Sequence, residues 1–363
     1  MPHTDSNILI NVLRNPNLMT GLSTYEWNEC LREAKIAGLA GRLAADAIYL
    51  DIIEQLPLKV QNTFQSNTYK SQSSTRKIKW EINRVRRAMQ GNDEKLILLK
   101  GGAYIAEELK CTQGRVSVDL DVLVAKNRID FAEEKFLAAG WEHQVENDYD
   151  QKYYREYAHE LPPMVHPERY ISIDVYYTIL PMTSRVKPDI QKMIKDSVIS
   201  LDGFYVFSKV DMLLHNVVHL FQDGEIRSSL RNLLEQHDMF TEFGQNETFW
   251  QSLVPRAVEL GLTRSLYYSL HFTKLIFQTD IPENVMTEIA PYGPGALTMG
   301  LMNWMVPAVI SPTLGARGLN RWICQNGLYM RSHWLKMPPL LLVKHLTIKF
   351  FINFTKKEET YSP

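Results

Sequence analysis

A pair of aspartates inside an apolar run limits what this chain can fold into. Asp119 and Asp121 lie in the segment Val118–Val124, VDLDVLV, which is otherwise apolar and predicts a buried β-strand. Residues two apart on a strand point to the same face, so the two carboxylates would lie together, about 7 Å apart at Cα. Burying them is costly unless a cation or hydrogen-bond donors compensate the charge. The segment therefore predicts carboxylates presented to an oxygen-preferring cation such as Mg²⁺.

A second apolar run precedes this strand and ends at a pair of glycines. Leu96–Leu99 predicts a strand, Gly101 and Gly102 follow after Lys100, and Ala103–Lys110 predicts a helix. Glycine lets the backbone approach a bulky anion, and a helix N-terminus adds N–H donors and a positive dipole. These segments predict an anion-binding turn beside the two carboxylates.

A third aspartate follows on a later strand. Asp174 lies in Arg169–Ile179, where apolar and aromatic residues alternate with polar ones. A two-metal centre holds its ions about 3.5–4 Å apart, one to activate the attacking oxygen and one to accompany a triphosphate. Asp119 and Asp121 would be shared ligands, and Asp174 would ligate the nucleophile-side ion or help to deprotonate the attacking hydroxyl. A D-x-D pair alone is a weak signal, but the preceding glycines and the later aspartate strengthen it.

The segments around this stretch predict an α/β (α+β) fold with a mixed sheet flanked by helices. Strand and helix patterns alternate through the middle of the chain, which indicates a mixed sheet. The further elements expected there are a helix over Ile129–Ala139, strands over Trp141–Val145 and Tyr153–Ala158, and a loop over Leu161–Pro167.

Helical periodicity dominates both ends of the chain. A helical hairpin with Thr24 as its N-cap is expected up to about Glu54, and a long basic helix from Leu58 to about Gln90. The basic residues of the long helix favour a solvated face over a nucleic-acid surface. After the sheet we expect four helices, which begin near residues 209, 228, 249 and 262.

Composition and charge exclude several classes of protein. Forty lysines and arginines against 41 aspartates and glutamates leave no global positive charge, so a nucleic-acid surface would have to be local. Three scattered cysteines are too few for a disulfide framework or a zinc site, which favours a reducing cytoplasm. The N-terminus lacks the pattern of a secretion signal. Prolines and glycines interrupt the most apolar window, Ile289–Ile310, and predict a broken helix there.

The C-terminal tail carries charge of one sign. No Asp or Glu occurs between Ile289 and Lys357, where Trp, Tyr and Phe are interleaved with basic residues. This composition fits a surface that meets anionic lipid or nucleic acid. Met337–Phe351 would suit a membrane interface, and a helix packed between domains is the alternative. We therefore expect a cytoplasmic protein, with peripheral contact to the inner face of the membrane through this tail as one alternative.

The motif order in the central stretch is K-G-G, a spacer, then R-x-S-x-D-x-D, from Lys100 to Asp121. It resembles the signature of the DNA polymerase β-type nucleotidyltransferase superfamily. Over Trp27 to Phe240 the chain is similar to an uncharacterised bacterial nucleotidyltransferase family often found near exported-peptide biosynthesis genes. It also resembles abortive-infection nucleotidyltransferase toxins. Many superfamily members have serine where this chain has Gly102, a change that the toxin-like relatives share.

The resemblance implies a polymerase-β-like fold and a reaction. An NTP and a hydroxyl acceptor would give an NMP-modified product and pyrophosphate, with two Mg²⁺ ions. Together with the element pattern and the composition of the tail, four regions are expected: an N-terminal helical region (1–90), a catalytic core (91–208), a helical domain closing the nucleotide site (209–280) and a basic C-terminal region (281–363).

The same resemblance assigns roles to particular residues. The triphosphate would lie on Gly101 and Gly102, and the Mg²⁺ ions on the three aspartates. The residues that would support the phosphates or the metal-binding strand are Lys100, Arg115 and Ser117. In the helical domain, Lys209 and Arg231 match basic positions that face the nucleotide, and the acidic residue that follows is either Glu235 or Asp238.

Several of these residues have a purely structural alternative. Lys100 could end a strand and extend its ammonium to solvent, and Arg115 and Ser117 could form an ion pair and a hydroxyl cap in a turn. Arg231 and Glu235 could be a helix salt bridge. His215 and His219 are spaced to share a metal, but no recognisable partner completes a site, so core or interface histidines are favoured.

Three functions stay open from the sequence. The first is NMP transfer, with a small molecule or peptide favoured over RNA because no RNA-reading module is recognisable. The second is a non-catalytic nucleotide-binding or membrane-associated scaffold. The third is a toxin that transfers nucleotides to tRNA.

Overall fold

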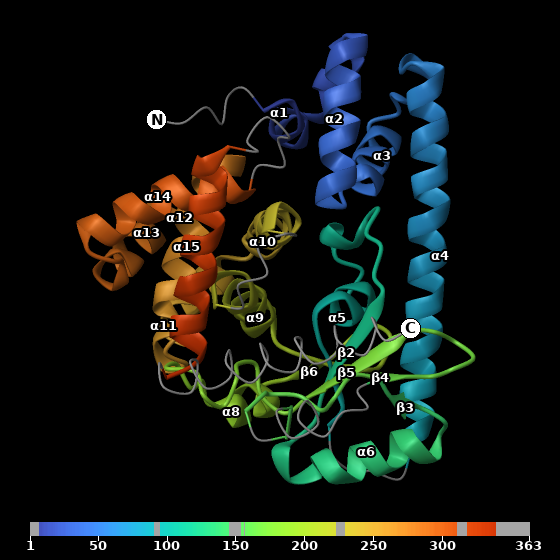
Figure 1. The fold of residues 1–363 in the computed structure, drawn as a ribbon, viewed down its shortest axis with the longest axis vertical. Coiled ribbons are helices and arrows are strands. Elements are labelled where there is room, and N and C mark those ends of the chain that lie inside the picture. Colours follow the sequence, from blue (N-terminus) through green and yellow to red (C-terminus); the bar gives the residue numbers. More distant parts are fainter. Residues whose placement is uncertain are drawn as a thin grey trace, which may run out of the picture.

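A mixed sheet of seven strands lies at the centre of the protein (Figure 1). The computed structural model describes residues 7–90, 95–144, 154–155, 157–222, 229–310 and 318–338. Within them the strand order is β3-β4-β5-β2-β1-β7-β6. The strands are β1 (Ile97–Leu98), β2 (Asp119–Leu123), β3 (Glu142–His143), β4 (Met164–Val165), β5 (Ser172–Tyr176), β6 (Val198–Ile199) and β7 (Tyr205–Val206). The predicted α/β fold with a mixed sheet flanked by helices is confirmed.

The two longest strands are parallel neighbours. β2 pairs with β5 in the register Asp119 to Ser172 and Asp121 to Asp174, and its other edge pairs antiparallel with β1. Leu120, Val122 and Leu123 are buried, so the apolar run makes β2 a core strand. This register sets two of the three predicted carboxylates directly opposite each other.

The elements around the sheet differ from the sequence prediction in three places. The predicted loop Leu161–Pro167 contains the short strand β4, because its Met164 and Val165 pair with β5. Within the predicted strand Tyr153–Ala158, residues 154 and 155 are helical, while residues 153 and 156 lie outside the described part. The helix predicted over Ala103–Lys110 is α5 (Lys100–Ala106). It begins earlier because the Ala103 N–H donates to the Leu99 carbonyl, which places both glycines inside its first turn.

Four helices precede the sheet, and of these α4 contacts β2. They are α1 (Ile8–Arg14), α2 (Thr24–Ala37), α3 (Ala40–Tyr49) and α4 (Leu58–Ala88). The long helix predicted after Pro57 is confirmed as α4, which runs along one side of the molecule and packs against α3, α5 and β2 (Figure 1). Thr24 is not the N-cap of α2: the Ser23 hydroxyl accepts from the Glu26 N–H, and the Glu26 carboxylate accepts from the Ser23 N–H. The serine precedes the helix by one residue and so has the extended backbone that a cap needs.

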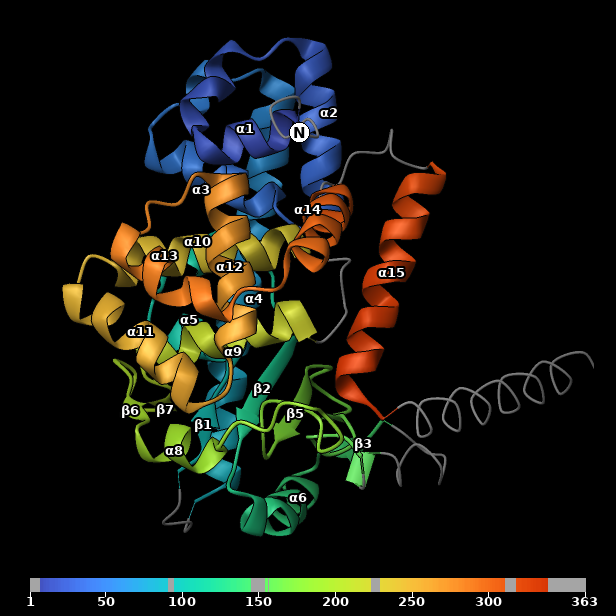
Figure 2. The same cartoon turned by 90° about the vertical axis from the view of Figure 1, so that its left-hand side faces the viewer.

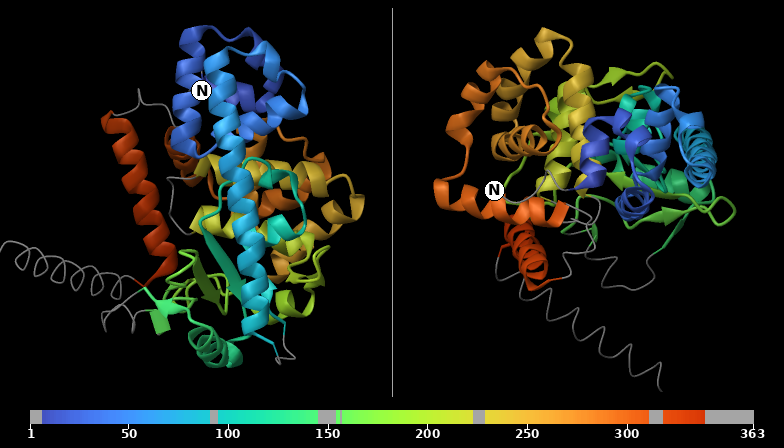
Figure 3. Two further views of the ribbon diagram at one scale, coloured as in Figure 1. Left: turned by 90° about the vertical axis from the view of Figure 1, so that its right-hand side faces the viewer. Right: turned by 90° about the horizontal axis from the view of Figure 1, so that it is seen from above.

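The C-terminal half is helical, as predicted. The four expected helices are α9 (Lys209–Gln222), α10 (Ser229–Phe243), α11 (Glu247–Glu259) and α12 (Thr263–Phe277). Figure 1 and the right-hand view of Figure 3 show them on the opposite side of the molecule from α4. The further helices are α6 (Ile129–Ala138), α8 (Ile190–Lys195), α13 (Glu283–Ile289), α14 (Ala296–Ile310) and α15 (Leu319–Lys336). The short 3₁₀ helices are Pro16–Gly21, Ile53–Gln55, Lys110–Thr112, Lys126–Arg128 and Ala290–Tyr292.

The apolar window Ile289–Ile310 is broken, as predicted. α13 ends at Ile289, a 3₁₀ turn follows, and α14 begins only at Ala296. None of the helices in the described residues is long and apolar enough to cross a membrane. The buried apolar side chains form a continuous core from α1 to α15. The division into four regions stays a prediction.

Candidate active site

Three aspartates lie on the two central strands. Asp119 and Asp121 are two apart on β2, and Asp174 on β5 pairs in register with Asp121. Asp121 is buried, whereas Asp119 and Asp174 are half-buried. Alternation along each strand and the parallel register therefore bring together the carboxylates that the sequence singled out.

The charges of these carboxylates affect one another. Burial, together with the negative charges of Asp121, Glu160 and Asp119, raises the pKa of Asp174 to about 8, while Lys100 acts in the opposite direction. Burial and the charge of Asp121 likewise raise the pKa of Asp119. The three groups thus form a partly desolvated acidic cluster that a cation would relieve.

Lys100 supplies positive charge to this cluster. Its Nζ lies 2.8 Å from Asp121 Oδ1 and 3.1 Å from the Tyr176 hydroxyl. It also lies 4.8 Å from the centre of the Tyr176 ring. The side chain is therefore directed into the protein, unlike the alternative in which it extends to solvent.

Arg115 joins the loop before β2 to the helical side of the site. Its Nε donates to Glu235 at 3.0 Å, and its Nη1 donates to the Ser117 hydroxyl at 2.7 Å. The Ser117 backbone is held in turn by the Ser74 hydroxyl of α4, which accepts from its N–H and donates to its carbonyl. Arg115 and Ser117 are therefore more than an isolated turn pair, because both are tied to other elements.

The two glycines of α5 make room for neighbouring side chains. A Cβ on Gly101 would lie 1.9 Å from Arg115 Nη1 and 2.9 Å from Ser117 Oγ, and one on Gly102 would lie 2.8 Å from Leu120 Cδ1. Packing against these side chains is by itself enough to favour glycine at both positions, without any contact to a ligand. Contact of these residues with a triphosphate stays a prediction.

Glu235 is the acidic residue of α10 that contacts both Arg115 and Arg231. It accepts from Arg115 and from Asn216, and its Oε1 lies 3.7 Å from Arg231 Nε. Asp238 instead pairs with Arg42 of α3, and its carboxylate lies 3.7 Å from Lys110 Nζ. Because the two residues lie about one turn apart along the axis of α10, their carboxylates contact different partners.

A hollow lies between α10, the turn after α2 and the loop before β2. Its lining includes three arginines, Arg42, Arg115 and Arg231, and two carboxylates, Glu235 and Asp238. Burial lowers the pKa of Arg231, and its buried Nε makes no hydrogen bond within the described residues. The guanidinium groups outnumber the carboxylates in this lining, so the hollow carries a small excess of positive charge.

Lys209 is the one predicted residue that the structure places apart from these contacts. It is exposed at the start of α9, and its Nζ lies 5.4 Å from the centre of the Phe243 ring. Phe243 ends α10, whereas Arg231 is near its beginning, so the two contact points are roughly 18 Å apart along that helix. Contact of Lys209 with a nucleotide stays a prediction.

Sequence reasoning missed four residues that take part in this site. Tyr176 lies two residues after Asp174 and therefore shares its face of β5, a signal that alternation could have supplied. Glu160, Ser74 and Arg42 come from distant segments, and nothing in their local sequence connects them with the aspartates.

The acidic cluster suits Mg²⁺ in its chemistry. All three groups offer carboxylate oxygens. The repulsion between their negative charges is only partly compensated by neighbouring cations. Yet over the part of the chain that the structure describes, no three His, Cys, Asp or Glu side chains lie closely enough to hold a metal ion. His215 is buried, and its ring packs edge-on against Phe207.

The mixed sheet, the paired aspartates and the arginine-lined hollow are features of an enzyme that handles nucleotides. The family model described as "Uncharacterised nucleotidyltransferase" matches residues 23–278, and the chain belongs to this family. The protein is thus a nucleotidyltransferase, and the resemblance seen in the sequence is confirmed. Searches of curated proteins and of solved structures found no match.

Proposed function

We propose that the enzyme transfers NMP from an NTP to a hydroxyl acceptor, with Mg²⁺ and release of pyrophosphate. The observation that carries the proposal is the register of β2 and β5, which sets Asp121 opposite Asp174 with Asp119 two residues away. Family membership supports the class of reaction.

Each aspartate has a role in this proposal. Asp119 and Asp121 would hold two Mg²⁺ ions, which would neutralise the phosphates and activate the attacking oxygen. Asp174, which pairs in register with Asp121, would ligate the nucleophile-side ion or help to accept the proton of the acceptor hydroxyl. Most of the catalysis would come from positioning and charge neutralisation.

Cationic side chains of the protein would bind the phosphates. Arg115 and Arg231 converge on Glu235, and Arg231 has a buried Nε free to donate a hydrogen bond to an anion. An incoming triphosphate would be a second anion for these guanidinium groups. Gly101 and Gly102 would let it approach the start of α5.

We propose a small molecule or a peptide as the acceptor, in the cytoplasm. The net charge of −1 provides no general attraction for RNA. On α4, Arg84 and Arg86 lie over the rings of Trp80 and Phe204, which fits a structural use of these cations. The free thiols of Cys30, Cys111 and Cys324 suit a reducing compartment.

The test is a screen for pyrophosphate release. The full-length protein is incubated with each NTP in labelled form, Mg²⁺ and fractions of cell extract. We expect one fraction to give pyrophosphate and a labelled product, and the Asp119→Ala/Asp121→Ala variant to lose both. Asp202→Ala, a change at an exposed loop residue, is the matched control and should retain them.

The result also separates the alternatives. Product labelled equally by the double variant and the wild type would contradict the proposal. NTP binding without pyrophosphate release in any fraction would indicate a non-catalytic scaffold. A labelled RNA band together with growth arrest on expression would indicate a tRNA-directed toxin.

A further inference from the structure

The outer face of α15 is apolar and exposed. Six large side chains, spaced three, four and seven residues apart, lie on this face: Leu319, Trp322, Ile323, Tyr329, Met330 and Trp334. Met330 is 71% exposed and Trp322 is 62% exposed. A contiguous set of this kind marks an interaction site more often than chance exposure does.

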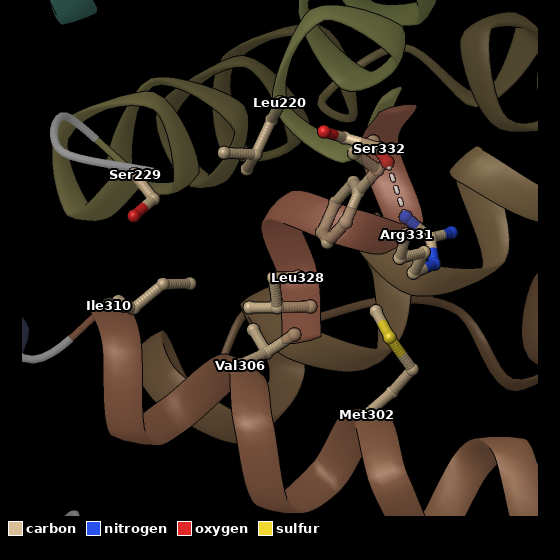
Figure 4. Close-up of a pocket in the computed structure, with 9 residues that line it drawn as sticks. Leu220, Ser229, Met302, Val306, Ile310, Leu328, Arg331 and Ser332 are labelled. Carbon is tan, nitrogen blue, oxygen red and sulfur yellow. Dashed lines mark hydrogen bonds between the residues drawn. The ribbon is translucent and has the colours of Figure 1, made fainter. Parts of the chain in front are cut away.

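The opposite face of α15 fixes the helix to the protein. Cys324, Leu328 and Ser332 are buried, and Arg331 Nη1 donates to the Phe221 carbonyl of α9 at 2.7 Å. Figure 4 shows Leu328, Arg331 and Ser332 turned toward side chains of α9, α10 and α14. The pocket left between them has a volume of only about 30 Å³, enough for two or three waters. The inner face is thus packed, and the outer face has no partner in the described residues.

α14 extends the same kind of surface. Leu297, Leu301 and Trp304 recur at helical spacing and are exposed. α14 and α15 pack against each other, and Figure 2 shows them at the edge of the molecule. We call the exposed apolar residues of both helices the α14–α15 surface.

The charge around this surface decides which partner it fits. No Asp or Glu occurs from Ile289 to Lys357, and in the described part of α15 the basic residues outside the packed inner face are Arg321 and Lys336. Beside the surface, the Arg185 guanidinium lies 4.2 Å from the centre of the Trp334 ring. Exposed tryptophan and tyrosine with cations and without carboxylates match the interface of an anionic bilayer.

We propose that the α14–α15 surface binds the enzyme to membranes that contain anionic lipid. The aromatic side chains would enter the headgroup region, and the basic residues would be attracted to the lipid phosphates. Contact is peripheral, because the described helices include none that could span the bilayer. The proposal is independent of the acceptor and of the transfer reaction.

The test is co-sedimentation of the full-length protein with vesicles. We expect binding to phosphatidylcholine vesicles that contain phosphatidylglycerol, little binding to phosphatidylcholine alone, and weaker binding at high salt. Trp322→Ser/Met330→Ser should lower the partition coefficient about tenfold or more. Tyr49→Ser/Tyr69→Ser, which removes exposed aromatics from α3 and α4, is the matched control and should bind like the wild type.

Melting curves show whether both variants fold, which we expect because all four side chains are exposed. The proposal fails if the wild type does not bind anionic vesicles, or if the α15 variant binds as well as the control. It also fails if the wild type forms a dimer that Trp322→Ser/Met330→Ser dissociates and neither protein binds vesicles. In that case a second copy of the chain covers the surface.

Discussion

The ammonium of Lys100 lies 2.8 Å from Asp121 Oδ1, so the first residue of α5 is paired with a buried carboxylate of β2. Lys100 reaches it from a left-handed backbone with φ of +42°, a conformation that costs a non-glycine residue about 1–2 kcal/mol. The ion pair must offset this cost. Asp121 Oδ1 is already paired with Lys100, so a divalent cation that binds this oxygen would compete with the ammonium group. Metal binding and the position of the Lys100 side chain are therefore coupled.

Replacing Lys100 should therefore leave the negative charge of the three aspartates without the cation that is paired with Asp121. We expect Lys100→Met to lower the free energy of unfolding by about 2–4 kcal/mol, because Asp121 would remain buried without its cation. Added Mg²⁺ should then raise the melting temperature of the variant more than that of the wild type. The control is Lys79→Met, whose exposed ion pairs should contribute less than about 1 kcal/mol. Equal stability of the two variants would contradict this role of Lys100.

Glu235 is the converse case, a carboxylate that lies between two arginines. Glu235→Gln leaves Arg115 and Arg231 without their carboxylate, and we expect a loss of about 3 kcal/mol in stability. Added pyrophosphate or NTP should restore more stability to this variant than to the wild type, because the anion would take the place of the carboxylate. Thermal unfolding with and without these anions is the measurement.

Asp238→Asn is the matched control for Glu235. Arg42 keeps Asp46 in that variant, with Nε 2.9 Å from Asp46 Oδ1, so the loss should be smaller and should not respond to pyrophosphate. If the two variants respond alike to the anion, Glu235 does not mark a phosphate site.

Local patterns were enough to predict the strands that carry the aspartates. An apolar run identified β2, alternation identified β5, and periodicity of about 3.6 identified α4 and the four helices from Lys209 onward. The pairing of Asp121 with Asp174 could not be predicted, because register depends on residues far apart in the chain.

The same limit applies to the choice between Glu235 and Asp238. Both follow Arg231 on α10 at similar spacing, and only Arg42, 196 residues from Asp238, separates their roles. The early start of α5 is a related case. Glycine is a poor helix former, but contacts with Arg115 and Leu120 select it within the first turn.

Two glycine substitutions test whether packing selects Gly101. In Gly101→Ala the new methyl group would displace the Arg115 guanidinium, and we expect a loss of about 1–3 kcal/mol in stability. Gly300→Ala is the control, since no atom lies within 4 Å of the added Cβ on α14. That variant should gain about 0.5–1 kcal/mol from helix propensity. Urea unfolding measures both, and a stabilised Gly101→Ala variant would contradict the close packing at this position.

A half-buried histidine on α10, His237, should make stability depend on pH. His237 Nδ1 lies 2.9 Å from Thr279 Oγ1, and its ring lies against Phe277. Burial lowers its pKa from 6.5 to about 4, with Lys110 and Arg42 acting in the same direction and Asp238 opposing them. The folded protein therefore holds the neutral ring where the unfolded chain would bind a proton.

The sign of the effect follows from this difference in proton binding. Between pH 6.5 and 4 the unfolded chain binds more protons at His237, so its contribution is complete above about pH 6.5 and is lost as the pH falls toward 4. By pH 5 the loss should be about 2 kcal/mol relative to pH 7. His237→Asn removes the titrating group and should have a flatter profile of unfolding free energy from pH 7 to 5. Because other groups titrate alike in both proteins, the difference between the profiles isolates His237, and parallel profiles would contradict the prediction.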